Sequence, residues 1–288
     1  MATTYNDLYL DLRKKLRQAG IEESTQAARE LVCTASGKTK EELMRDGRLY
    51  VASEVENTVY DLAQRLFAGE PVAYLVGEWE FFGLPLDISP AVLIPRPDTE
   101  VLVEQVIEKT KDLPECSILD LCAGSGCIGL ALAANLPHAR VLLGEIDDEA
   151  LKVCRQNMRR NNLTGRVASM RVDALKKPAR NLGEFHVIVS NPPYIPTKDI
   201  ETLDPSVRDH EPHLALDGGE DGLMFYRAIV EKWHDALAKD GLLAFEVGIG
   251  QADEVLRIMR GGGFGDVQIV KDRNDIPRVV FGTVCDEI

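Results

Sequence analysis

The stretch Phe185-His186-Val187-Ile188-Val189-Ser190-Asn191-Pro192-Pro193-Tyr194 joins an apolar run to a double proline. Residues 185–189 are rich in β-branched side chains and are followed at once by turn-forming residues, which predicts a buried strand. A helix cannot begin at Asn-Pro-Pro-Tyr, because each proline lacks an N–H group and pushes the preceding residue toward extended geometry. We therefore expect a stiff, extended segment at residues 191–194, here called the lip. It would lie at the carboxyl end of a strand, where open α/β sheets bind ligands.

The lip presents two hydrogen-bond acceptors. Asn191 offers a side-chain oxygen, and Pro192 offers a carbonyl oxygen with no N–H group of its own. Two acceptors on a rigid segment suit a flat –NH2 group, and the Tyr194 ring can lie against the plane of the group that carries it. A double-proline turn that merely closes a strand is the alternative interpretation. The flanking Asn and Tyr favour a binding role.

A second motif lies upstream, between a strand predicted at 117–121 and an Ala/Leu-rich helix. Residues 124–129 read Gly-Ser-Gly-Cys-Ile-Gly and match the pattern G-x-G-x-x-G. Its glycines permit a tight turn and let a ligand approach the backbone closely. Glu145 ends the next predicted strand, where a carboxylate can accept both hydroxyls of a ribose. Both features fit a dinucleotide as well as S-adenosylmethionine.

Two aspartates help to separate these cofactors. Asp120 lies just before the glycine turn, where a carboxylate would repel a pyrophosphate but would suit the ammonium group of a methionine moiety. Asp173 follows the predicted strand at 167–172 and can accept from an adenine amino group. Capping of the two loops is the alternative role for both side chains.

Strands and helices alternate from about residue 116, which predicts a mostly parallel sheet with helices on both faces, a Rossmann-like α/β fold. The expected strands lie at 117–121, 141–145, 167–172, 185–189, 242–247, 266–271 and 277–283. Helical periodicity predicts a small helical bundle over residues 1–75. Residues 76–100 predict a hairpin and linker, which leaves 101–288 for the main domain. We expect the helical domain to grip a partner.

Composition limits the classes of function. Lys and Arg total 33 against 47 Asp and Glu, a formal net charge of −14. Because phosphate binding relies on clustered cations, this balance argues against a duplex nucleic acid as the main partner. The sequence has no apolar run of about 18 residues and no signal-peptide core, so we expect neither a membrane span nor export. The six cysteines lack zinc-ligand spacing, which predicts no metal site and a reducing, cytoplasmic location.

These features together resemble the HemK/PrmC family of S-adenosylmethionine-dependent methyltransferases, which act on a glutamine of peptide chain release factors. The matching stretches are residues 70–77, 93–100, 120–126, 190–195, 211–223 and 245–248, with Gln251. The Asn-Pro-Pro-Tyr element is shared with adenine amino-methyltransferases, so it indicates the type of reaction rather than the substrate. The stretch from Glu211 to Leu223 narrows the family considerably.

The resemblance implies that the substrate is the glutamine of the Gly-Gly-Gln motif in class-I release factors, methylated on its side-chain nitrogen. It implies that the cofactor S-adenosylmethionine is held by Cys122, Ala123, Gly124, Ser125, Gly126, Glu145 and Asn191. With the candidates Asp120, Asp173 and Ala174, these residues complete the expected cofactor site. It also implies that the glutamine amide is held by Asn191, Pro192, Pro193 and Tyr194, among which Asn191, Pro192 and Tyr194 would be catalytic. We expect a monomer that binds neither DNA nor a membrane.

Three positions depart from the common methyltransferase pattern. Cys122 stands where a glycine is frequent, so we expect no positive φ there. Glu145 replaces the commoner Asp, which would shift the ribose slightly. Ala174 follows Asp173 where an aromatic residue would be expected beside the adenine.

Three other functions remain open from the sequence. An adenine amino-methyltransferase would use the same lip, although the acidic composition and the lack of a base-reading domain disfavour it. A nicotinamide dehydrogenase would explain the glycine loop but would leave the lip and Asp120 without a role. A cofactor-binding adaptor of the translation machinery, without enzymatic activity, is the weakest alternative because the expected chemical residues are present.

Overall fold

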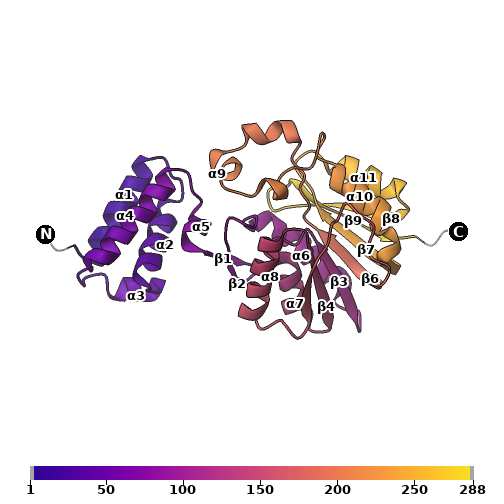
Figure 1. Cartoon of the computed structure of the whole chain (residues 1–288), viewed down its shortest axis with the longest axis horizontal. Helices are drawn as coiled ribbons and strands as arrows, with labels where there is room; N and C mark the ends of the chain where they lie inside the picture. The colour runs from indigo at the N-terminus through magenta and orange to yellow at the C-terminus, as the bar shows by residue number, and fades with distance from the viewer. Residues whose placement is uncertain (1–2, 286–288) are drawn as a thin grey trace. The chain divides into compact units, whose positions relative to one another are not determined.

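The computed structural model describes residues 3–285, and this part of the chain divides into two compact units (Figure 1). One unit contains the chain up to Glu78 together with Asp204–His210, and the other contains Trp79–Leu203 and the chain from Glu211 onward. Each unit buries a hydrophobic core of its own. None of the described helices combines the length and the apolar character needed to cross a membrane.

The first unit is helical. Its elements are α1 Tyr5–Gln18, α2 Ser24–Ser36, α3 Lys40–Arg45, α4 Ser53–Phe67, α5 Val72–Val76 and the short α9 Pro205–Arg208. α1 begins after Thr4, whose hydroxyl accepts from the N–H of Asp7 while the Asp7 carboxylate accepts from the N–H of Thr4. Leu8, Leu12 and Leu16 recur every four residues, so they share one face of α1 and are fully buried.

The second unit is built on a sheet that has seven strands within the described residues, in the order β5-β4-β3-β6-β7-β9-β8. They are β3 Cys116–Leu121, β4 Ala139–Glu145, β5 Val167–Arg171, β6 Phe185–Ser190, β7 Leu237–Glu246, β8 Phe264–Lys271 and β9 Pro277–Val284. The neighbours from β5 to β7 are parallel, whereas β9 is antiparallel to both β7 and β8. The expected mostly parallel α/β sheet is therefore confirmed. β1 Glu78–Phe81 and β2 Leu84–Asp87 form a separate two-stranded sheet.

Helices cover both faces of this sheet. They are α6 Glu100–Thr110, α7 Cys127–Asn135, α8 Asp148–Arg160, α10 Met224–Trp233 and α11 Ala252–Gly261. Leu119 and Leu121 of β3 join the core cluster that α10 and α11 supply. Asp120 must point to the opposite face because successive side chains of a strand alternate, and there it contacts Gly129 of α7.

The parallel register brings the carboxyl ends of four strands to one edge of the sheet. Leu121 at the end of β3 pairs with Gly144 of β4 and with Ser190 of β6, and Ser190 pairs in turn with Phe245 of β7. The segments that follow these strands are therefore neighbours, although they are far apart in the sequence. They include the glycine loop, the lip and the turn after β7.

Candidate active site

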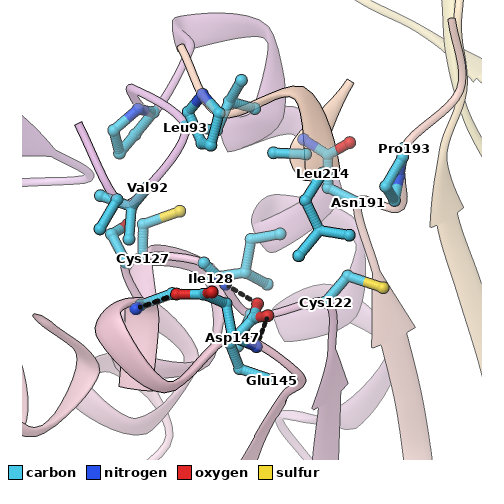
Figure 2. Close-up of a pocket in the computed structure, with 18 of the residues that line it drawn as sticks. Val92, Leu93, Cys122, Cys127, Ile128, Glu145, Asp147, Asn191, Pro193 and Leu214 are labelled. Carbon is cyan, nitrogen blue, oxygen red and sulfur yellow. Dashed lines mark hydrogen bonds between the residues drawn. The ribbon is translucent and has the colours of Figure 1, made fainter. Parts of the chain in front are cut away.

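A cavity of about 300 Å³ lies among these segments. Figure 2 shows Asn191 on one side of it, Val92 on the other and Glu145 at its foot. Most lining residues come from the glycine loop, the start of α7, the turn after β4 into α8, the lip and two further loops at 91–99 and 212–215, and Phe225 adds one from α10. The glycine loop and the lip, which the sequence predicted separately, therefore share one site.

Three glycines shape the loop between β3 and α7. At Gly126 φ is +81°, and a Cβ there would lie 2.9 Å from Leu143 Cδ1. A Cβ at Gly129 would come within 2.3 Å of Leu143 Cδ2, so these two glycines let α7 pack closely against β4. Gly124 has φ +55° but nothing within 4 Å of its Cβ position, and it lines the cavity. Its backbone is therefore open to a ligand.

The expectation for Cys122 was wrong, because this residue has φ +61°. The left-handed conformation costs a non-glycine residue roughly 1–2 kcal/mol, and the surrounding contacts enforce it. The N–H of Ala123 continues the pairing with β4 by donating to the Gly144 carbonyl at 3.2 Å, and on the other side Ser190 Oγ donates to the Leu121 carbonyl at 2.6 Å. Cys122 is thus held between two strands, with its side chain in the cavity wall.

Glu145 links the loops that follow β3 and β4. Its carboxylate accepts from the backbone N–H of Gly124 at 2.9 Å through Oε2, and from those of Ile146 at 2.7 Å and Asp147 at 2.9 Å through Oε1 (Figure 2). The residue is 8% exposed and lines the cavity. A carboxylate has about four acceptor positions, so this one keeps capacity for a ligand hydroxyl.

The structure does not bring Asp120, Asp173 or Ala174 into the cavity wall. Asp120 is fully buried behind the glycine loop, where its Oδ2 accepts from the N–H of Gly129 at 2.8 Å and burial raises its pKa to about 7. The Asp173 carboxylate caps its own turn at Leu175 and pairs with Lys176 at 3.0 Å. The Ala174 carbonyl accepts from Trp233 Nε1 at 3.0 Å. The two aspartate side chains and the Ala174 carbonyl therefore organise loops. For the two aspartates this is the alternative role considered above.

The lip contributes Asn191 and Pro193 to the cavity wall, while Pro192 is buried and Tyr194 does not line the cavity. The Tyr194 ring packs against the core that contains α10 and α11, and burial raises the pKa of its hydroxyl to about 12. Asn191 is thus the polar side chain of the lip that faces a ligand.

Residues that received no role from the sequence hold the lip from behind. Gln251 Nε2 donates to the Tyr194 carbonyl at 2.9 Å and to the Gly222 carbonyl at 3.3 Å, and its Oε1 accepts from the N–H of Gly248 at 3.1 Å. A Cβ at Gly222 would lie 2.3 Å from the Tyr194 oxygen, and one at Gly218 would lie 2.8 Å from the Tyr194 Cα. The glycines of the 211–223 stretch are therefore needed because the lip packs directly against their backbone.

An ion pair joins the two remaining loops of the cavity. Arg96 is paired with Glu211, whose side chain is only 1% exposed and whose Oε2 also accepts from the N–H of Ile94 at 3.2 Å. Arg96 thus has an internal partner and also lies in the cavity wall.

The chain matches the family models of the methyltransferase small domain over residues 97–219 and of the PrmC N-terminal domain over residues 7–77. The release factor glutamine methyltransferase of Caulobacter vibrioides is 38% identical over 284 residues, 98% of this chain and 97% of that protein. The enzyme of the same name from Bradyrhizobium diazoefficiens is 38% identical and covers 93% of this chain and 91% of its own. That of Geobacter sulfurreducens is 44% identical over 77% of this chain and 76% of its own length.

Solved structures share the fold at low sequence identity. The hMettl16 catalytic domain in complex with the MAT2A 3′UTR hairpin 1 superposes with a TM-score of 0.57 at 19% identity, over 72% of this chain and 77% of that one. A methyltransferase from Pyrococcus furiosus gives a TM-score of 0.53 at 18% identity, over 77% of this chain and 98% of that one. At these identities the likenesses support the fold alone.

Proposed function

The chain belongs to the release factor glutamine methyltransferases, and from this premise we propose that it uses S-adenosylmethionine to methylate the glutamine of the Gly-Gly-Gln motif in class-I release factors. The methyl group goes to the side-chain amide nitrogen. The observation that carries the proposal is that Asn191 of the lip and Glu145 beside the glycine loop line one cavity. A methyl donor and an amide can therefore meet there.

The residues of the cavity fit the proposed cofactor. Glu145 has spare acceptor capacity for the ribose hydroxyls, and the open space at Gly124 admits a ligand against the backbone. Apolar side chains such as Ile128 and Val92 provide a surface for the adenine ring. We assign the cofactor to residues 122–126 and Glu145, with Asp120 ordering the loop from behind. When bound, S-adenosylmethionine supplies an electrophilic methyl group on its sulfonium centre.

The lip makes a poor nucleophile reactive. A carboxamide nitrogen is weakly nucleophilic because its lone pair is delocalised into the carbonyl group. Asn191 Oδ1 and the Pro192 carbonyl accept the two N–H groups of the substrate amide, which favours the pyramidal nitrogen. Both hydrogen bonds strengthen as positive charge develops on that nitrogen, so they act mainly in the transition state. The nitrogen becomes acidic only as it gains the methyl group, so its proton can pass to water without a strong base.

The choice of substrate must depend on the rest of the partner. Glutamine and adenine both present a planar –NH2 group, so the lip alone cannot distinguish them. The net charge of −14 disfavours a phosphate backbone. We propose that the helical segment 1–75 contacts the release factor and supplies part of the affinity, while the two small glycines of the motif let the glutamine reach the recessed lip.

Radiolabelled methyl transfer tests the proposal. Label from S-adenosylmethionine should enter an intact class-I release factor and should be absent when the glutamine of its Gly-Gly-Gln motif is replaced by alanine. Deleting residues 1–75 should lower the rate on the intact release factor more than the rate on a short Gly-Gly-Gln peptide. Label in DNA adenine, with none in the release factor, would refute the proposed substrate and favour the nucleic-acid alternative.

A further inference from the structure

Glu246 is a buried carboxylate that the mechanism above does not use. It is the last residue of β7 and is 2% exposed. Because Ser190 pairs with Phe245 in the parallel register, the next residue of each chain segment, Asn191 and Glu246, lie beside each other. Its Oε2 has no hydrogen-bond partner among the described residues. A buried charge is costly unless it has a structural or chemical role.

Thr99 and Asn191 are the polar side chains that face this carboxylate. Burial raises the pKa of Glu246 to about 7, and the nearby Thr99 and Asn191 side chains oppose this rise. Asn191 Nδ2 also donates to Thr99 Oγ1 at 3.4 Å, and Thr99 is itself 2% exposed at the cavity wall. The three side chains therefore form one polar cluster at the back of the lip, in which Thr99 and Glu246 are buried and Asn191 is half-buried.

The Arg278 guanidinium, whose charge acts on Glu246, is already paired with other carboxylates. Arg278 of β9 bridges Asp98 at 2.8 Å and Asp272 at 3.1 Å. Among the described residues, no cationic side chain forms a salt bridge with Glu246. The carboxylate is thus available to accept hydrogen bonds from Thr99 and Asn191.

The cluster determines which end of the Asn191 amide faces the cavity. Asn191 Nδ2 faces Thr99. In its ionised form the Glu246 carboxylate only accepts hydrogen bonds, so it holds the –NH2 group of the amide on this side. Its Oδ1 is then left for the substrate. In the reversed orientation two –NH2 groups, those of Asn191 and the substrate, would face each other without an acceptor.

We propose that Thr99 and Glu246 are positioning residues that hold the Asn191 amide with its oxygen toward the substrate amide. This inference rests on the proposed function. The lip then has two separate supports. Gln251 holds the Tyr194 backbone, and the Thr99–Glu246 pair orients the Asn191 side chain.

Substitutions at Thr99 test the orientation. Thr99→Val keeps the shape of the side chain and removes the hydroxyl, whereas Thr99→Ser keeps the hydroxyl. In single-turnover transfer to an intact release factor, Thr99→Val should slow the rate about 10- to 100-fold, the factor one buried hydrogen bond is worth, while Thr99→Ser retains most of it. S-adenosylmethionine affinity and release factor KM should stay within about twofold of the parent.

Thr110 supplies a matched control at the end of α6, the helix that begins directly after Thr99. It is also 2% exposed, and its hydroxyl donates within α6 to the Val106 carbonyl at 2.7 Å. Thr110→Val should therefore lose a buried hydroxyl without a change in transfer rate. Equal rates for Thr99→Val and Thr99→Ser would overturn the proposal. A parent protein that transfers no label at all would instead refute the proposed function.

A second experiment does not depend on Thr99. Asn191→Asp places a second carboxylate beside Glu246, so its transfer rate should be low. Adding Glu246→Gln should raise the rate at least about fivefold above that of Asn191→Asp alone, because the glutamine amide can donate to the new carboxylate. A purely structural role for Glu246 predicts no such rescue. A double variant no faster than Asn191→Asp would contradict the proposed orientation.

Discussion

Replacing Glu145 by alanine should weaken cofactor binding and also loosen the apo site. The carboxylate accepts from three backbone N–H groups, so its removal leaves Gly124, Ile146 and Asp147 without this partner. Hydrogen bonds to a charged group contribute about 1.5–3 kcal/mol each, and water in the cavity can replace part of them. Because water replaces part of the three lost hydrogen bonds, we expect the free energy of unfolding to fall by about 2–4 kcal/mol in total. Loss of the ribose contact should weaken S-adenosylmethionine binding by a further 1–3 kcal/mol, about 5- to 150-fold.

Two measurements separate these effects. Urea denaturation without ligand gives the change in stability, and isothermal calorimetry at a temperature where the variant is folded gives the affinity. Glu145→Gln should lie between alanine and the parent, because it keeps one acceptor oxygen. Asp148→Ala, which removes a side chain that is 72% exposed two residues after Ile146, serves as the control and should change neither quantity. An affinity of Glu145→Ala within twofold of the parent would remove Glu145 from the cofactor site.

Three further predictions address the lip, the buried carboxyl and the glycine backing. Asn191→Ala should lower the single-turnover methyl-transfer rate about 100-fold while the KM for the release factor changes little, since its hydrogen bond counts most in the transition state; equal single-turnover rates would disprove the mechanism. Burial raises the pKa of Asp120 in the folded state to about 7, against an ordinary value of 3.8. The folded state therefore binds this proton more tightly than the unfolded state does. As pH rises from about 4 to 7, the contribution of Asp120 to the free energy of unfolding falls. Asp120→Asn should flatten that decline in urea midpoints measured from about pH 4 to pH 8, and an unchanged slope would count against the raised pKa. Gly222→Ala should lower the free energy of unfolding by at least about 1 kcal/mol more than Gly183→Ala does. Both glycines have positive φ, but only at Gly222 would a Cβ meet the Tyr194 oxygen. Equal melting temperatures for the two variants would show that the clash relaxes.

Local sequence patterns correctly predicted the elements whose residues are contiguous in the chain. The strand at 185–189 and the double proline after it became β6 and the lip, and the glycine pattern at 124–129 became the turn into α7. Where strand pairing extends an element beyond its local pattern, the predicted bounds were less accurate. β7 begins at Leu237 rather than near 242, since its first residue pairs with Phe185 across an irregularity in register.

The contacts that support the site could not be predicted, because they join residues distant in the sequence. Asn191 and Thr99 lie 92 positions apart, and Gln251 and Tyr194 lie 57 apart. Strand alternation could have placed Asp120 on the α7 side of the sheet, but only the packing of Gly129 shows that the carboxylate is covered. At Cys122 a non-glycine residue suggested negative φ, and the pairing of both neighbouring strands overrides that local preference.

The supports of the lip have a consequence for the order in which the site is assembled during synthesis. The cofactor loop is held by β3, β4, α7, α8 and β6, all complete by residue 190, whereas Glu246 and Gln251 emerge about 55 to 60 residues later. A nascent or prematurely terminated chain that ends before residue 246 thus carries the glycine loop and the lip sequence but lacks the groups that fix Asn191 and Tyr194. Ligand affinity should consequently appear earlier along the growing chain than catalytic competence does.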